Sequence, residues 1–281
     1  MIDGRGWGSR ILRIYLPVMG FLVLMLFPFY WMLIASIKPN RELYNAKIMP
    51  LIVYQPTLKH YYDLFADTNF LLWTYNTMLV AVITTAVSLV LGAMIAYPLA
   101  RMNFPGAAIV AVGVAAPYLV PQPLLFIPMA DIINKLELGN TLSAVMLTYP
   151  TLLIPFCAWL LMGYFKSVPR ELEEAARIDG ASRFQAMWRV VLPLTVPGLL
   201  SAGIFAFTLA QNEFLYALIF LAKSEVRTVP VGAITELIRG DVFYWGQLMA
   251  AALLGSIPVA VIYSFFVDYY VAGLTAGSVK S

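Results

Sequence analysis

The sequence predicts an all-α integral membrane protein with six transmembrane helices. Of its 281 residues, 61% are hydrophobic and 12% are charged, whereas soluble domains average about 45–50% and about 25%. A helix crosses the hydrocarbon of a bilayer with about 20 apolar residues, and six runs of the chain are long enough. These runs are residues 11–37, 73–100, 107–130, 142–165, 196–221 and 246–267.

The six runs are expected to be helices because every backbone polar group in lipid needs a partner within the protein. Each run is about twice as long as a membrane β-strand and lacks the alternating pattern of a β-barrel. The first run follows Arg5, Arg10 and Arg13. It exceeds the roughly 7–15 apolar residues of a signal peptide, so we interpret it as an uncleaved first span with the N-terminus in the cytoplasm.

Four prolines interrupt the third run, and two interpretations stay open. Each proline removes a backbone donor and bends a helix. A broken helix is tolerated in a membrane where it faces protein or a water-filled cavity, which favours a pore-lining or gating helix. Simple kinking for packing explains the same pattern. The prolines are Pro117, Pro121, Pro123 and Pro128.

Several classes of function find no support in the sequence. There is no G-x-x-x-x-G-K-[ST] loop for ATP, so the chain is not expected to bind ATP by that mechanism. Cys157 and His60 are the single cysteine and histidine, and we expect a core thiol and a loop imidazole rather than ligands of a metal. The basic residues are scattered between apolar runs, so no nucleic-acid partner is predicted. Energy must come from a partner subunit or an ion gradient.

Residues 166–195 form the most informative connection between spans. Pro169 suits the first position of a helix, and Gly180 suits the left-handed conformation that closes one. Ser182 and Gln185 have the S-x-x-Q spacing of a capping box that opens a second helix, which Pro193 ends. The segment is therefore predicted to be two short helices joined by a sharp turn.

This segment is also predicted to dock against another protein. Its small side chains allow a close approach, and several apolar side chains would be poorly placed in water. The alternative is an amphipathic loop lying on the membrane surface, which its arginines favour. The small residues are Ala175 and Ala176, and the apolar ones are Ile178, Phe184, Met187 and Trp188.

The same segment resembles the signature of permease subunits of binding-protein-dependent ABC importers. That signature is Glu-Ala-Ala, three residues, Gly, nine residues and Ile-x-Leu-Pro. The chain matches it at Glu174, Ala175, Ala176, Gly180, Leu192 and Pro193, with Val190 in place of the isoleucine. The resemblance implies that the loop is cytoplasmic and docks on an ATPase subunit. The coupling residues it implies are Glu174, Ala175, Ala176, Arg177, Asp179, Gly180 and Phe184.

The wider chain resembles the carbohydrate-uptake branch of this family, the maltose-transporter G-type permeases. The features are the six-span plan, the sequence Gln-Asn-Glu-Phe-Leu at 211–215 and the ending Val-Ala-Gly-Leu-Thr-Ala-Gly at 271–277. Relatives often carry tryptophan at the position of Gln211. The resemblance implies a type I ABC importer permease fold and a di- or oligosaccharide or a polyol as substrate. A non-sugar solute is the alternative.

The resemblance also implies the assembly and the location of the protein. The expected partners are a second permease in a heterodimer, two ATPase subunits that bind ATP and Mg, an extracytoplasmic binding protein and membrane lipid. The chain itself is expected to bind no cofactor. It is expected in the bacterial inner membrane with both termini in the cytoplasm. The expected parts are a cytoplasmic segment 1–10, a first span and outer loop 11–72, a core 73–267 containing the coupling loop 166–195, and a cytoplasmic tail 268–281.

Gln211, Asn212 and Glu213 lie in the middle of the fifth apolar run. A carboxyl group at that depth costs about 2.5 kcal/mol or more, so it should face a cavity or a hydrogen-bonding partner. These residues are expected to line the translocation path or its gate. Hydrogen bonding between helices is the alternative.

Two other classes of protein remain as alternatives. A stand-alone secondary transporter would have an internal repeat and ion-coupling carboxylates in several spans. An integral membrane enzyme would have catalytic residues clustered near one membrane face. Neither pattern is evident in the sequence.

Overall fold

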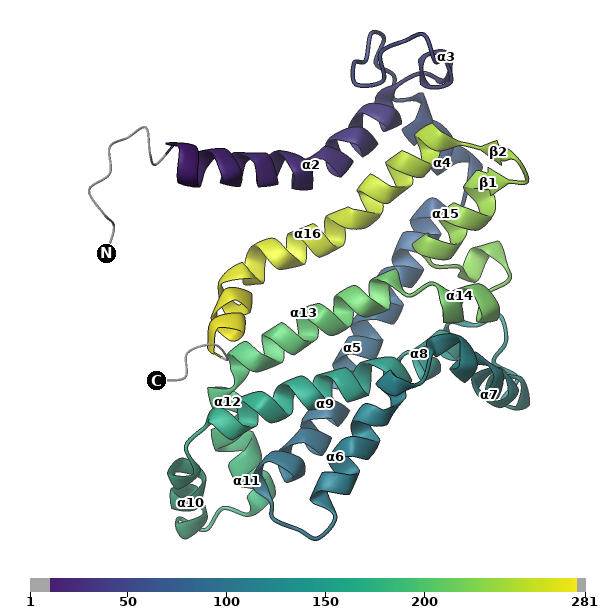
Figure 1. The fold of residues 1–281 in the computed structure, drawn as a ribbon. Helices are drawn as coiled ribbons and strands as arrows, with labels where there is room; N and C mark the ends of the chain where they lie inside the picture. The colour runs from purple at the N-terminus through teal and green to yellow at the C-terminus, as the bar shows by residue number, and fades with distance from the viewer. Residues whose placement is uncertain (1–10, 277–281) are drawn as a thin grey trace. The chain divides into compact units, whose positions relative to one another are not determined.

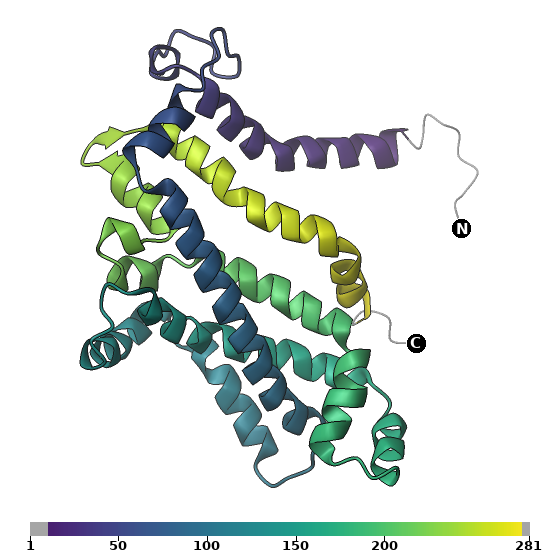
Figure 2. The same ribbon diagram turned by 180° about the vertical axis from the view of Figure 1, so that it is seen from behind.

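The structure is a computed structural model that describes residues 11–276, and it confirms the all-α fold (Figures 1 and 2). Within those residues, β-structure is confined to one short hairpin. The elements are η1 (Ile11–Tyr15), α2 (Leu16–Ile37), α3 (Asn40–Leu43), α4 (Lys59–Asp67), α5 (Phe70–Arg101), α6 (Ala107–Ala115), η2 (Ala116–Leu119), α7 (Gln122–Lys135), α8 (Leu142–Thr148), α9 (Pro150–Ser167), α10 (Arg170–Ile178), α11 (Arg183–Ala186), η3 (Met187–Val191), α12 (Leu192–Leu194), α13 (Val196–Asn212), α14 (Leu215–Phe220), η4 (Ser224–Val226), α15 (Val229–Leu237), β1 (Ile238–Arg239), β2 (Val242–Phe243) and α16 (Trp245–Ala276).

Four stretches of helix among the described residues are long and apolar enough to span a membrane. They are Ile11–Ile37, Phe70–Arg101, Leu142–Ser167 and Trp245–Val267. The pair Arg183–Leu194 and Val196–Asn212, bent by 80° at its break, would make a fifth. The six apolar runs therefore do not all correspond to single continuous helices.

The third predicted run, 107–130, is not one helix, and its prolines explain why. It consists of α6, η2 and the first part of α7. Val120 is extended, with φ −91° and ψ 125°, a conformation favoured for a residue that precedes proline. Pro121 then begins α7 as its N-cap. Pro128 lies inside α7.

The fifth predicted run, 196–221, is also divided. Helix α13 ends at Asn212, and Glu213 takes the extended values φ −64° and ψ 127°. Helix α14 then begins at Leu215. Both interrupted runs thus have extended backbone near their middle, where polar backbone groups need other partners.

The chain divides into two compact units. The second consists of Leu71–Gly232 and the described residues after Ser256. Its larger apolar cluster joins α5, α7, α8, α9, α13 and α14 and includes Val80, Ile133, Leu153, Phe207 and Tyr216. Helices α9 and α13 pack along each other, as Figure 1 shows. Cys157 lies in this cluster with no exposed surface, so the prediction of a core thiol is confirmed.

A second apolar cluster lies at the α10–α12 end of the same unit. Met187, Val191 and Leu192 of the loop segment pack there against Tyr97 of α5 and Phe165 of α9. In Figure 1, α10 and α11 lie at one end of this unit and α7, α8 and α14 lie at the other, and Figure 2 shows the same unit from behind. The 166–195 segment is therefore attached to the spans by a continuous core.

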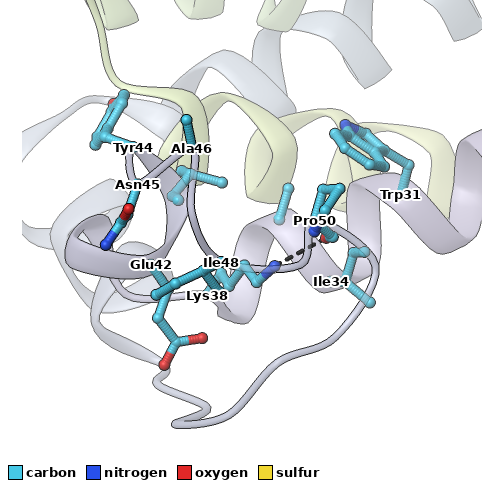
Figure 3. A pocket seen from close by; sticks show the side chains of 11 residues that line it. Trp31, Ile34, Lys38, Glu42, Tyr44, Asn45, Ala46, Ile48 and Pro50 are labelled. Carbon is cyan, nitrogen blue, oxygen red and sulfur yellow. Dashed lines mark hydrogen bonds between the residues drawn. The ribbon is translucent and has the colours of Figure 1, made fainter.

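The first unit contains the described part of residues 1–70 together with Ala233–Ser256. After α2, the chain folds into an ordered loop around a cavity of about 320 Å³, drawn in Figure 3. The buried Lys38 ammonium donates to the carbonyl oxygens of Met49 (3.0 Å) and Pro50 (2.8 Å). The imidazole of His60 lies 2.8 Å from the carbonyl of Lys38, so His60 is buried in α4 rather than exposed on a loop.

Residues 222–245 form several short elements. They contain η4, α15 and an antiparallel hairpin in which Ile238 pairs with Phe243. In the second unit, their first part is held to α5, because the Trp73 indole donates to the carbonyl of Ser224 at 2.9 Å. The predicted segment 1–10 lies outside the described residues, as do residues 277–281 of the predicted tail.

Replacing Gly232 by alanine is expected to destabilise the protein. A Cβ there would lie 2.3 Å from the fully buried ring of Trp73, and forcing an extra carbon into a packed core costs about 1–3 kcal/mol. Thermal unfolding in detergent measures the effect. Gly113→Ala is the matched control, because a Cβ at Gly113 meets nothing within 4 Å. Equal melting temperatures for the two variants would contradict the expected clash.

Candidate functional site

The predicted helix-turn-helix is present, and backbone hydrogen bonds define its turn. Helix α10 is followed by Gly180 with φ +92°, the left-handed value expected from the sequence. The amide of Gly180 donates to the carbonyl of Arg177, and that of Ala181 donates to the carbonyl of Ala176. This is a Schellman motif, which satisfies the last carbonyls of the helix. Pro169 is the N-cap of α10, one position earlier than predicted.

The second helix begins with the predicted capping box. The Ser182 hydroxyl accepts from the amide of Gln185, and the Gln185 side chain accepts from the amide of Ser182. The helix continues through η3 and α12 and ends at Thr195, beyond Pro193. Thr195 is buried and marks the 80° bend into α13. The loop is thus a stiff unit joined directly to a span.

The helix-turn-helix of α10 and α11 is called the hairpin from here on. Its exposed face contains most of the predicted coupling residues. Glu174, Ala175, Arg177, Asp179 and Gly180 are exposed, and Ala176 is partly exposed. Ile178 is 86% exposed and Phe184 is 59% exposed. The ring of Trp188, which is also exposed, packs edge-on against Phe184.

Met187 does not belong to this face. It is only 3% exposed and packs in the cluster with α5 and α9. The prediction that Met187 is part of a docking face is therefore wrong. Its burial follows from its contacts with α5 and α9, because it lies only three residues from Phe184 and helical spacing alone would leave it near the exposed face.

The structure adds three residues that sequence reasoning missed. Tyr97 and Arg101, one turn apart on α5, both approach Glu173 of α10. The Tyr97 hydroxyl lies 2.5 Å from Glu173 Oε1, and Arg101 Nε lies 3.5 Å from Glu173 Oε2. The available signal was the i, i+4 spacing of Tyr97 and Arg101 at the end of an apolar run.

A small, strongly polar cavity lies beside this contact. It has a volume of about 250 Å³. Four arginines line it together with both adjacent glutamates of the motif. The lining residues are Arg101, Met102, Asn103, Arg170, Glu173, Glu174, Arg177 and Arg183. The hairpin therefore presents charge of both signs next to its exposed apolar residues.

A larger cavity of about 690 Å³ lies at the two helix breaks in the same unit. The third predicted run contributes Pro117, Val120, Pro121 and Gln122, and the fifth contributes Thr208, Asn212 and Glu213. For Pro117 and Pro121 this arrangement favours the cavity-facing interpretation over simple kinking, whereas Pro123 and Pro128 are not among the lining residues. Apolar walls come from Leu125, Tyr149, Leu152, Leu153, Leu209, Ala210, Phe214 and Leu215.

Glu213 links the two breaks. Its carboxylate accepts from the amides of Tyr216 (2.9 Å) and Ala217 (3.2 Å) at the start of α14. It also accepts from the Gln122 side chain at 3.0 Å, at the start of α7. One carboxylate thus accepts from two backbone amides at the start of α14 and from a side chain at the start of α7. Glu213 therefore both makes a hydrogen bond between helices and lines the cavity.

The other two residues of this cluster have different surroundings. Asn212 is exposed and lines the cavity. Its side-chain amide donates to the carbonyl of Thr208 at 2.9 Å. Gln211 is 7% exposed and does not line the cavity described above. Asn212 and Glu213 are therefore brought together at the cavity, while Gln211 packs within the helices.

The fold and these two sites are typical of one class of protein, the all-α membrane permeases with a helical hairpin between two spans. The chain matches the family of binding-protein-dependent transport system inner membrane components over residues 88–275. The chain belongs to that family, and it is a multi-pass permease subunit of a binding-protein-dependent ABC importer.

Two relatives match nearly the whole chain. The sulfoquinovosyl glycerol transport system permease SmoH of Agrobacterium fabrum is 38% identical over 256 residues, covering 91% of this chain and 89% of the relative. The trehalose/maltose transport system permease MalG of Thermococcus litoralis is 34% identical over 261 residues, covering 92% of each.

Solved structures support the fold. A chain of a bacterial ABC transporter that imports the acidic polysaccharide alginate superposes with a TM-score of 0.77 at 21% identity, covering 95% of this chain and 99% of the other. A second alginate transporter structure, in complex with a periplasmic protein that holds an alginate pentasaccharide, gives a TM-score of 0.66 at 16% identity, covering 92% and 93%. The type I importer permease fold is thus confirmed.

Replacing Gly180 by alanine is expected to loosen the hairpin. A side chain in the left-handed conformation costs about 1–2 kcal/mol, even though a Cβ would meet no atom within 4 Å. Hydrogen exchange of the α10 amides should become faster by about 5- to 30-fold. Gly139→Ala, at a loop glycine that also has open space and no left-handed backbone, should leave that exchange unchanged. Unchanged exchange in Gly180→Ala would contradict the role of the turn.

Replacing Glu213 by alanine is expected to destabilise the protein more than Gln122→Ala does. The first change leaves two backbone donors and one side-chain amide without their acceptor, and an unsatisfied buried donor costs about 1–3 kcal/mol. The second change removes one donor and leaves the α14 bonds in place. Melting temperatures of the two purified variants provide the test. Equal losses would mean that the cap on α14 contributes nothing.

Proposed function

We propose that this chain is the membrane-spanning subunit of an ATP-driven sugar importer, and that it couples closure of a partner ATPase to alternating access. The observation that carries the proposal is the hairpin of α10 and α11. It has an exposed face of charged and apolar residues, and its opposite side is packed into the spans. Such a face suits docking, because large exposed apolar side chains beside charges are typical of interfaces.

The attachment of the hairpin supports transmission of movement. Met187 and Val191 pack on α5 and α9, and α12 leads through Thr195 into α13. At its far end, α13 stops at the cavity, where Glu213 joins its break to that of the third run. Displacement of the hairpin would therefore move a helix whose other end lines the cavity. Packed cores respond to such displacement as units rather than by deforming continuously.

The chemistry of the large cavity supports a hydroxylated substrate. Gln122, Asn212 and Glu213 provide amide and carboxylate groups for hydrogen bonds to hydroxyls. Phe214 and the surrounding leucines provide apolar surface, as ligand sites usually do. Together with the sugars in the names of both relatives, this favours a di- or oligosaccharide or a polyol.

The partners and the orientation follow from the same proposal. The hairpin lies in the cytoplasm and docks on one of two ATPase subunits, which bind ATP and Mg; this chain holds neither. A second permease completes the path as a heterodimer, and an extracytoplasmic binding protein delivers the sugar on the side of residues 222–245. Both termini are then cytoplasmic, in agreement with the arginines that precede the first span.

Charge reversal at Glu174 tests the docking role. With tagged protein purified gently from its host, Glu174→Lys is expected to lose the co-purifying ATPase subunit and to reduce sugar uptake by at least about tenfold. The reason is that it removes one partner of an interfacial charge pair, a change that costs about 2–5 kcal/mol. Glu137→Lys, which reverses an exposed carboxylate in the loop after α7, is the control and should behave like the wild type.

Three outcomes would change the conclusion. Normal uptake by Glu174→Lys at equal membrane level would refute docking through this residue. ATP-dependent uptake of a non-sugar solute alone would keep the importer and correct the substrate. Solute movement by the isolated chain in liposomes without ATP would replace the importer with a stand-alone secondary transporter.

A further inference from the structure

Two adjacent glutamates of the hairpin have opposite surroundings. Glu173 is turned toward the spans, and its side chain is only 13% exposed. Glu174 is exposed, and its carboxylate has no ion pair among the described residues. Since successive residues on a helix point about 100° apart, one acidic group faces inward and its neighbour faces outward.

The inward carboxylate is held by two side chains of α5. Oε1 of Glu173 accepts from the Tyr97 hydroxyl at 2.5 Å, a length typical of a hydrogen bond to an ionised acceptor. Oε2 lies 3.5 Å from Nε of Arg101. The side chain of Arg101 is 3% exposed, so its charge is buried and needs a nearby anion. Glu173 supplies it.

The same two side chains of α5 also approach the backbone before α10 and at the start of α11. Arg101 Nη2 donates to the carbonyl of Val168 at 2.7 Å, just before the helix begins. The Tyr97 hydroxyl, whose single proton is donated to Glu173, also lies 3.1 Å from the carbonyl oxygen of Arg183 at the start of α11. The hairpin is therefore tied to one turn of α5 just before α10, through Arg101 and Val168, and within α10, through Tyr97, Arg101 and Glu173.

These contacts differ in kind from the apolar cluster beside them. Met187 and Val191 pack against Tyr97 and Phe165, and apolar packing is non-directional. It resists separation but specifies orientation weakly. The hydrogen bonds from Tyr97 to Glu173 and from Arg101 to Val168 have defined geometry, so they fix how the hairpin is oriented relative to α5. The 3.5 Å contact between Arg101 Nε and Glu173 adds charge attraction.

We propose that Glu173, Tyr97 and Arg101 form a clamp that passes movement of the hairpin to α5, while Glu174 is left free for the ATPase. This inference rests on the proposed function. Glu173 is then a positioning residue, because it acts through α5 and touches neither the nucleotide nor the transported solute. Its loss would uncouple the hairpin from α5 without removing the hairpin's docking face.

The test compares Glu173→Gln, Tyr97→Phe and Glu174→Gln in the full transporter, reconstituted in liposomes with its binding protein. Three quantities are measured: ATPase subunit retained, ATP hydrolysed and sugar taken up. Tyr97→Phe removes only the hydroxyl and keeps the ring in its cluster. It therefore keeps the proposal testable if Glu173→Gln, which leaves the buried Arg101 without its anion, fails to fold.

The clamp predicts a specific pattern. Glu173→Gln and Tyr97→Phe should retain the ATPase subunit and hydrolyse ATP, while sugar uptake per ATP falls about tenfold. The double variant should be no worse than Glu173→Gln, because both changes break the same contact. Glu174→Gln should instead lose the ATPase subunit. A purely structural role would lower all three quantities in proportion to the amount of folded protein.

The proposal is overturned if both clamp variants keep the wild-type uptake per ATP. Hydrogen exchange on the purified chain separates this failure from failure of the proposed function. If the wild type shows no ATP-driven uptake, the proposed function fails. Faster exchange of the α10 amides in Tyr97→Phe than in the wild type would still support the clamp as a contact, and unchanged exchange would reject it.

Discussion

The structure depends on one constraint, which is that a backbone polar group within a membrane must find its partner inside the protein. Continuous helices meet it automatically. This chain interrupts two of its apolar runs, at Val120–Pro121 and at Glu213–Phe214, and each interruption frees backbone groups. Both breaks lie at one cavity, and the Glu213 carboxylate accepts from donors on both sides. A charge that is costly in lipid is thus held where polar groups already need a partner.

The same reasoning explains why the two ends of the second unit differ. At the cavity end, hydrogen bonds from extended backbone and side chains replace regular helix. At the hairpin end, the backbone is satisfied by a Schellman motif and a capping box, so the hairpin is stiff without help from lipid. Helix α13 joins these two ends. A stiff element at one end of a helix and an interrupted structure at the other is an arrangement suited to passing movement along the helix.

Charge is distributed according to the surroundings of each group. All four of Arg101, Glu173, Glu174 and Arg177 line one polar cavity, but the side chains of Arg101 and Glu173 are largely buried, whereas Glu174 and Arg177 are exposed. Buried charges without partners are strongly destabilising, and exposed ones cost little. The buried arginine thus has a nearby anion, and the outward charges remain exposed without a penalty to stability.

The sequence by itself determined the membrane character, the helix-turn-helix and its motif, because these depend on local properties: apolar length, the conformational freedom of Gly180 and the capping spacing of Ser182 and Gln185. It also identified Glu213 and the four prolines as candidate residues of a path or gate. It did not reveal that the third and fifth runs are broken and meet at one cavity. Only the tertiary structure decided that Met187 is buried and that Glu173 contacts Tyr97 and Arg101. Those facts depend on contacts between residues about 70 to 90 positions apart, and no local pattern specifies which faces of distant helices come together.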